Sequence, residues 1–202
     1  MRRIAALIFP GFELLDLYGP MEMFGFLPAE FDLKLFAEGS DPVASSQGLR
    51  AQPDATLGDA ESFDVLFVPG GMGTRREVGN EALLDWIARS AARAECTLSV
   101  CTGAALLAKA GVLDGRRATT NKAAFHWVAE QGPQVDWVRA ARWVEDGAFV
   151  TSSGVSAGMD MALGVIARLH GEDAAKEVAT KAEYVWQRDR DHDPFAAVHG
   201  LV

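Results

Sequence analysis

Short apolar runs recur along the chain, and the segments between them carry apolar side chains at helical spacing. The runs 4–9 and 64–68 each end in a Pro-Gly pair, and the run 96–100 leads directly into an alanine-rich segment. Runs of this kind are typical of strands buried on both faces of a sheet. Residues 31–36 alternate apolar and polar positions, which also predicts a strand. Short strands are expected over 118–120 and 135–140.

Helices are predicted between these strands. Residues 81–94 place their apolar side chains on one side, as an amphipathic helix does. The Gly19-Pro20 pair interrupts the first helical segment, so one or two turns over 12–18 and a separate helix over 21–26 are expected. Further helices are predicted over 104–110, 122–130, 159–170 and 173–188.

Two dipeptides between extended segments indicate hairpins. Gln47-Gly48 separates two short extended segments, and Asp146-Gly147 lies inside the extended stretch 143–150. A glycine in such a pair favours the tight turn that a hairpin needs. Strands that alternate with helices over the rest of the chain predict an α/β fold with a mainly parallel sheet.

Length and charge narrow the class of protein. With 202 residues and neither a repeat nor a linker, one domain spanning residues 1–202 is expected. The net charge of −9, from 19 basic and 28 acidic residues, argues against a nucleic acid or an anionic membrane as partner. No run is long enough to span a membrane. Cys96 and Cys101 lie on one strand, where the alternating directions of side chains disfavour a disulfide between them, so a reducing, cytoplasmic compartment is expected.

Cys101 lies where the run 96–100 meets the alanine-rich segment, the strand–turn–helix layout of a nucleophile elbow. A tight turn needs small residues, which Thr102 and Gly103 supply. At the start of a helix the thiolate is expected to be favoured, and the backbone N–H of Thr102 is expected to face an anion formed by nucleophilic attack. The alternative is a buried structural cysteine.

Two other predicted strands end at the same edge of the sheet, where open α/β proteins bind ligands. Asp16 lies in the first one or two helical turns after the first strand, and another strand ends before Gly70-Gly71. Asp16 is a candidate proton carrier whose pKa is raised by burial beside the thiol, and Gly71 is a candidate second backbone donor. Asp16 could instead be a cap or turn residue, and Glu13 and Glu22 compete with it.

The histidines are weaker candidates. His126 is interpreted as a partly exposed helical residue, and His170-Gly171 as the end of a helix. His192 and His199 belong to a polar tail. No spacing of histidines, cysteines and acidic residues suggests a metal site, no phosphate loop is present, and no cofactor is expected.

Together these motifs resemble those of the ThiJ/PfpI superfamily, relatives of the class I glutamine amidotransferases. The resemblance implies a flavodoxin-like three-layer sandwich with a mainly parallel central sheet flanked by helices. Within the superfamily, the chain most resembles isocyanide hydratase and the amidotransferase-like domains of AraC-type regulators. The similar segments are 9–11, 15–20, 69–71, 99–103, 111–120 and 153–160.

The resemblance implies roles for the residues at the predicted edge. Cys101 would be the nucleophile, Asp16 the acidic partner at its sulfur, and Gly71 and Thr102 the backbone donors. In the hydratase, the thiolate attacks the terminal carbon of an isocyanide, and water then releases an N-substituted formamide. A small, apolar substrate is therefore expected, in a pocket lined by Phe12, Tyr18, Gly70, Thr120, Asn121 and Val155.

Two positions depart from the patterns of the superfamily. The protease-like branch carries a histidine directly after the cysteine, where this chain has Thr102, so peptidase activity is not expected. The hydratase carries a histidine after its paired threonines, where this chain has Asn121 followed by Lys122. This substitution changes one wall of the expected pocket.

Two other functions stay open. One is glyoxalase- or deglycase-like handling of reactive carbonyls, although the Parkinson-associated branch uses Glu where Asp16 stands. The other is a redox or ligand sensor, in which Cys101 would be oxidised to a sulfinate stabilised by Asp16. The resemblance also implies a homodimer with two-fold symmetry.

Overall fold

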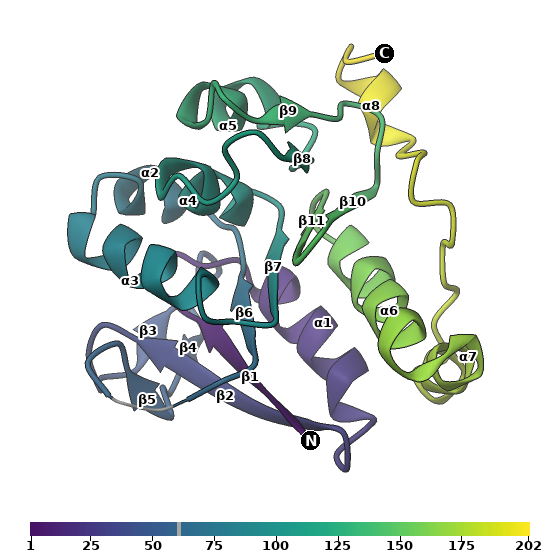
Figure 1. The fold of residues 1–202 in the computed structure, drawn as a ribbon, viewed down its shortest axis with the longest axis horizontal. Coiled ribbons are helices and arrows are strands. Elements are labelled where there is room, and N and C mark those ends of the chain that lie inside the picture. Colours follow the sequence, from purple (N-terminus) through teal and green to yellow (C-terminus); the bar gives the residue numbers. More distant parts are fainter. Residues whose placement is uncertain (60–61) are drawn as a thin grey trace.

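The computed structural model of the chain describes residues 1–59 and 62–202. A seven-stranded sheet in the order β10-β11-β7-β6-β1-β2-β5 forms its centre (Figure 1). Neighbouring strands pair in parallel, except that β10 is antiparallel to β11. The strands are β1 (Arg2–Leu7), β2 (Phe31–Ala37), β5 (Ala55–Thr56), β6 (Val65–Val68), β7 (Cys96–Val100), β10 (Trp143–Asp146) and β11 (Phe149–Ser152).

Helices cover both faces of this sheet, which gives three layers (Figure 1). One face packs against α1 (Leu14–Gly25) and α6 (Ala157–His170), and α7 (Glu172–Lys181) packs on α6. The other face packs against α4 (Gly103–Lys109), which contacts α2 (Thr74–Glu77), α3 (Glu81–Ala91) and α5 (Phe125–Gln131). The predicted α/β, flavodoxin-like sandwich with a mainly parallel sheet is confirmed.

The central strands explain the apolar runs in the sequence. Every residue of β6 and β7 is buried, because both strands lie between two neighbours and under helices on both faces. The carboxyl ends of β1, β6 and β7 therefore meet at one edge of the sheet. No helix among the described residues has the length and apolar character needed to cross a membrane.

Two pairs of strands form the predicted hairpins. β3 (Val43–Ala44) and β4 (Arg50–Ala51) pair antiparallel around Gln47-Gly48, and β10 and β11 pair around Asp146-Gly147, so both predicted hairpins are confirmed. The remaining elements are β8 (Arg117–Ala118), β9 (Asp136–Trp137) and α8 (Phe195–Val198), the last of which was not predicted.

The predicted break at Gly19-Pro20 is wrong, because both residues lie inside the continuous helix α1. They lie where α1 crosses α6. A Cβ added at Gly19 would lie 2.9 Å from Cγ of Met159, and one added at Gly158 would lie 3.0 Å from Cγ of Pro20. Close packing between the two helices therefore overrides the tendency of a proline to end a helix.

The helix predicted over 173–188 ends earlier, at Lys181. Glu183 follows with a left-handed backbone (φ +49°), and the chain leaves the helical path there. Buried Asp160 of α6 holds the segment beyond it, since its Oδ1 accepts hydrogen bonds from the Tyr184 hydroxyl at 3.0 Å and from the Gln187 N–H at 2.9 Å. These contacts between distant segments replace the last helical turns.

Candidate active site

Cys101 lies between the carboxyl end of β7 and the start of α4, at the sheet edge where the predicted strand ends converge. Its backbone is left-handed (φ +56°), a conformation that few residues other than glycine adopt. The Cys101 N–H donates to the carbonyl oxygen of Ser152 at 3.1 Å, and the Thr120 hydroxyl donates to the Cys101 carbonyl oxygen at 2.7 Å. Hydrogen bonds from two other segments thus hold the strained turn.

The small residues of this turn are required by close backbone contacts. A Cβ added at Gly103 would lie 2.8 Å from the carbonyl oxygen of Pro69, so α4 can begin this close to β6 only with glycine. A Cβ added at Gly154 would lie 2.8 Å from the Cys101 sulfur. The sulfur is therefore enclosed on one side by the backbone that follows β11.

Asp16 reaches the same edge from the first turn of α1, and its side chain is fully buried. Its Oδ2 accepts a hydrogen bond from the Gly70 N–H at 3.0 Å. Its second oxygen, Oδ1, accepts no hydrogen bond from the other described residues in this geometry. The carboxyl group interacts with the Cys101 thiol. Of the competing acids, Glu22 is exposed and Glu13 lies at the rim of the site. The structure thus brings Asp16 and Cys101 together.

The two groups hold their protons tightly. Burial raises the pKa of Asp16 to about 8, against the hydrogen bond from Gly70, and the negative charge of Glu13 adds to the increase. Burial also raises the pKa of Cys101 well above its ordinary value, and the Asp16 charge raises it further. The hydrogen bond from the Thr102 N–H opposes these effects without cancelling them. These effects on the pKa of Cys101 run against the expectation that the helix start favours a thiolate.

The two predicted backbone donors differ in the structure. The Thr102 N–H interacts with the Cys101 sulfur. The Gly71 N–H instead donates to Oγ1 of Thr102 at 3.0 Å, and this oxygen also lies 3.1 Å from Oγ1 of Thr74. The Thr102 N–H is therefore placed to stabilise an anion beside the sulfur, whereas the Gly71 N–H already donates to the Thr102 hydroxyl oxygen.

A pocket of about 360 Å³ opens onto Cys101. Two of the predicted pocket residues, Asn121 and Val155, line it. Phe12 and Tyr18 do not. Phe12 is fully buried in the hydrophobic core. Tyr18 is exposed because it lies two residues after the buried Asp16, about 200° further around α1. The lining residues are Glu13, Gly71, Met72, Arg75, Cys101, Thr102, Asn121, Ala123, Ala124, His126, Trp127 and Val155.

Gly70 and Thr120, also predicted for the pocket, do not line it, but they form hydrogen bonds with Asp16 and Cys101. The Gly70 N–H holds the Asp16 carboxyl, and the Thr120 hydroxyl holds the Cys101 carbonyl. Lys122 points away from the pocket and is buried, with Nζ donating to the carbonyl oxygen of Ala141 at 2.6 Å.

The outer wall of the pocket contains residues that the sequence did not predict for the site. Arg75 lies with its guanidinium carbon 4.5 Å from the ring centroid of Trp127, and His126 lies beside them. With Glu13, these residues make the rim more polar and charged than the apolar pocket that was expected. Trp127 could have been noticed as a large aromatic residue off the buried face of its helix. Nothing local marked Arg75.

No group of three or more His, Cys, Asp or Glu within the described ranges is arranged to hold a metal ion. The chemistry that the described site offers is that of a thiol, a buried carboxyl, backbone N–H groups and a small pocket.

Residues 2–168 match the DJ-1/PfpI family, and the chain belongs to that family. It is 39% identical over 184 residues to isonitrile hydratase of Pseudomonas putida, covering 90% of this chain and 78% of the relative. It is 34% identical over 180 residues to the HTH-type transcriptional regulator CdhR of Pseudomonas aeruginosa, covering 86% of this chain but only 52% of the regulator. The superfamily resemblance noted in the sequence is confirmed.

The solved structures agree with this assignment. A ThiJ/PfpI family protein from Pseudomonas syringae superposes with a TM-score of 0.84 at 35% identity, covering 96% of this chain and 76% of that protein. The relatives thus include a protein named as an enzyme and one named as a regulator.

Proposed function

We propose that this protein is a cysteine-dependent hydratase that converts a small isocyanide and water into an N-substituted formamide. The observation that carries the proposal is the buried pair of Asp16 and Cys101 at the end of a pocket. The identity to isonitrile hydratase over most of the chain supports the same reaction.

In the proposed reaction, Asp16 moves a proton between sulfur and carbon. Cys101 Sγ forms a bond to the terminal carbon of the isocyanide while its S–H bond breaks. The ionised carboxyl of Asp16 accepts that proton and passes it to the same carbon, which gives a thioimidate, R–N=CH–S–Cys101. The carboxyl is close enough for this role because it already interacts with the thiol.

Hydration then releases the product. Water adds across the C=N bond, so that oxygen bonds to carbon and a proton reaches nitrogen. As the carbonyl forms, the C–S bond breaks and the sulfur regains a proton through Asp16, leaving R–NH–CHO. The sum is one isocyanide and one water per formamide, and the pair returns to its starting state.

The pocket supports a substrate with a small, uncharged body. Its volume of about 360 Å³ lies toward the lower end of the range for small-molecule sites, roughly 300–1,000 Å³. Met72, Trp127 and Val155 offer apolar contact surface for the group attached to nitrogen. The guanidinium of Arg75 is stacked on Trp127 at the rim of the pocket.

The test is to incubate the protein with an alkyl or aryl isocyanide and to follow formamide by NMR. We expect turnover that Cys101→Ala abolishes and that Cys96→Ala, the matched control at the other cysteine, retains within twofold. Absence of turnover, or equal turnover in Cys101→Ala, overturns the proposal. Consumption of methylglyoxal in place of isocyanide would favour the carbonyl-handling alternative.

We further propose that the protein works as a two-fold symmetric homodimer, as the family resemblance implies. Light scattering of the purified protein should give twice the chain mass of 21.7 kDa. A monomer at micromolar concentration would refute this part and leave the reaction untouched.

A further inference from the structure

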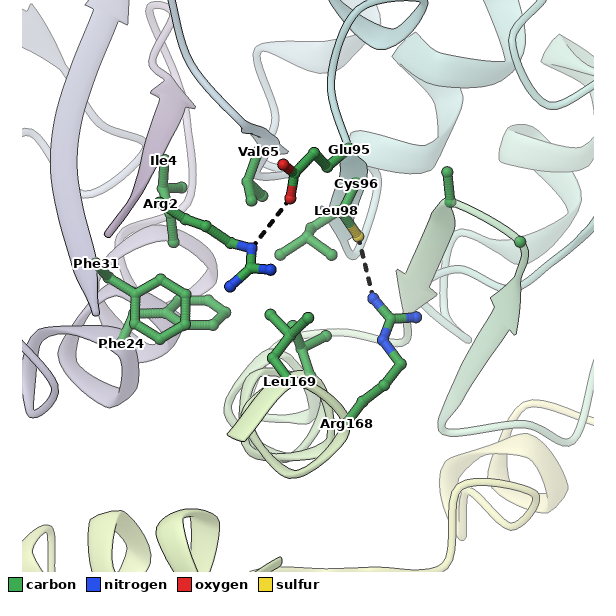
Figure 2. Close-up of a pocket in the computed structure, with 13 residues that line it drawn as sticks. Arg2, Ile4, Phe24, Phe31, Val65, Glu95, Cys96, Leu98, Arg168 and Leu169 are labelled. Atoms are coloured by element: carbon green, nitrogen blue, oxygen red, sulfur yellow. Dashed lines mark hydrogen bonds and ion pairs between the residues drawn. The ribbon is translucent and has the colours of Figure 1, made fainter. Parts of the chain in front are cut away.

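A second cavity, also of about 360 Å³, lies at the opposite edge of the sheet from Cys101 (Figure 2). It is formed where β1, β6 and β7 begin and where α6 ends, with α1 and β2 closing one side. None of its lining residues belongs to the pocket at Cys101. The lining residues are Arg2, Ile4, Phe24, Phe31, Val65, Glu95, Cys96, Leu98, Gly147, Ala148, Val165, Arg168 and Leu169.

Most of this wall is apolar. Phe24 and Phe31 form one side, with ring centroids 5.0 Å apart in an edge-to-face arrangement. Leu98 and Val165 are almost completely buried, and Leu169 lies opposite the two phenylalanines (Figure 2). Such a surface favours a hydrocarbon or aromatic body over a polar ligand.

Two guanidinium groups enter the cavity from different elements (Figure 2). Arg2, on β1, donates from Nε to Glu95 at 3.1 Å. Its two terminal nitrogens form no hydrogen bond with the described residues and point into the cavity. Arg168, on α6, donates from Nη2 to the sulfur of Cys96 at 3.3 Å and pairs with Glu145 at 3.0 Å through Nη1. The cavity thus combines an apolar wall with the terminal nitrogens of Arg2, which have no described partner, beside an Arg168 guanidinium that Cys96 and Glu145 hold in place.

The charge of the lining selects a ligand class. Glu145, which pairs with Arg168, also pairs with Arg190 at 3.6 Å, so the three guanidinium groups of this cluster face two carboxylates, Glu95 and Glu145, an excess of one positive charge. The chain as a whole carries −9, so this local excess runs against its average. A planar carboxylate matches the terminal nitrogens of a guanidinium and neutralises the excess.

We propose that this cavity is a binding site for a small amphipathic carboxylate, with its head group on Arg2 and Arg168 and its apolar body against Phe24, Phe31 and Leu169. The volume equals roughly a dozen water molecules at about 30 Å³ each, which suits a medium-chain alkyl or a single-ring aryl carboxylate. The site is separate from the proposed reaction and does not depend on it.

Octanoate is the probe, and octyltrimethylammonium, which has the same tail and the opposite charge, is its matched control. Isothermal titration should show that octanoate binds at least tenfold more tightly than the cation. Leu169→Trp, which fills the cavity, should weaken octanoate binding at least tenfold, and Arg2→Met at least fivefold. Cys101→Ala should bind octanoate as the unmodified protein does. Melting curves check that each variant is folded.

Cys96 supplies an independent readout, because its sulfur lines the cavity. In the Cys101→Ala protein, saturating octanoate should slow alkylation of Cys96 by iodoacetamide at least fivefold. Equal affinity for both probes, unchanged binding in a folded Leu169→Trp variant, or loss of binding in Cys101→Ala overturns the proposal. Protection of Cys96 that rises with protein concentration without any ligand would also overturn it, since a second copy of the chain would then cover the cavity.

Discussion

The two cysteines of this chain lie at opposite ends of β7, each beside a cavity, yet their surroundings are opposite in chemistry. As whole residues both cysteines are almost equally buried, at 6% exposure for Cys96 and 7% for Cys101. Cys96 lies in regular strand geometry beside the guanidinium of Arg168. Cys101 lies in a left-handed turn beside the carboxyl of Asp16.

This difference shows that burial alone does not decide what a thiol can do. A guanidinium stays protonated, so Arg168 can stabilise negative charge near Cys96 but cannot take its proton. A carboxyl whose pKa lies near 8 can both accept and return a proton at Cys101. Proton transfer is therefore available at one end of β7, and recognition of an anion at the other.

The largest effect should come from removing the proton carrier. Asp16→Asn keeps the shape of the side chain but cannot accept the thiol proton, so kcat/KM for an isocyanide should fall by about 10²–10⁴-fold. Arg168→Met, the equivalent change beside Cys96, should leave kcat/KM within about twofold of the unmodified protein, since it is remote from the reacting atoms. Steady-state kinetics measure both. Activity of Asp16→Asn within tenfold of the parent would contradict the role of Asp16.

Replacing a glycine beside each cavity should lower the free energy of unfolding by different amounts. Gly71 has φ +131°, and an added Cβ would lie 2.6 Å from the backbone nitrogen of Glu13, so Gly71→Ala should cost about 3 kcal/mol or more. Gly147, at the other cavity, has φ +59° and would meet nothing closer than 3.8 Å, so Gly147→Ala should cost only about 1 kcal/mol. Urea unfolding measures both. Equal costs would show that backbone crowding is not special to the Cys101 end.

The pH dependence of the reaction should follow the ionisation of Asp16. Below pH 8 the carboxyl is protonated and cannot take the thiol proton, so kcat/KM should rise about tenfold per pH unit to a midpoint near 8 and then level off. Glu13→Gln removes a charge that raises this pKa and should move the midpoint to lower pH. A profile that is flat between pH 6 and 9 would exclude Asp16 as the proton acceptor.

Folding stability should also depend on pH through Asp16. The pKa of Asp16 is 3.8 when unperturbed and about 8 in the folded protein, so between these values the folded state binds more protons than the unfolded state. Folding stability contributed by this group therefore falls as pH rises from 4 to 8. Asp16→Asn should melt at a higher temperature than the parent, by a margin that grows over this range.

The control for this prediction is Glu22→Gln, which changes an exposed carboxyl on the same helix. It should leave stability within about 0.5 kcal/mol at every pH. A melting difference for Asp16→Asn that stays constant between pH 4 and pH 8 would mean that its carboxyl is not buried in a protonated form.

Local pattern predicted much of the fold because each strand and helix is encoded by its own periodicity. The run 96–100, the small residues after it and the Pro-Gly ends of two other strands were enough to place Cys101, Asp16 and Gly71 at one edge, since the ends of parallel strands must meet there.

By itself, then, the sequence determined most of the strand and helix order, the sheet edge that carries the thiol, and Asp16 as one of three candidate acids beside it. Only the tertiary structure decided that Pro20 stays helical, that Arg75 and Trp127 form the rim of the pocket, and that Arg2 and Arg168 meet beside Cys96. The physical reason is that these outcomes depend on contacts between elements far apart in the chain. Local periodicity states which face of an element is buried, but not which distant side chain it will meet.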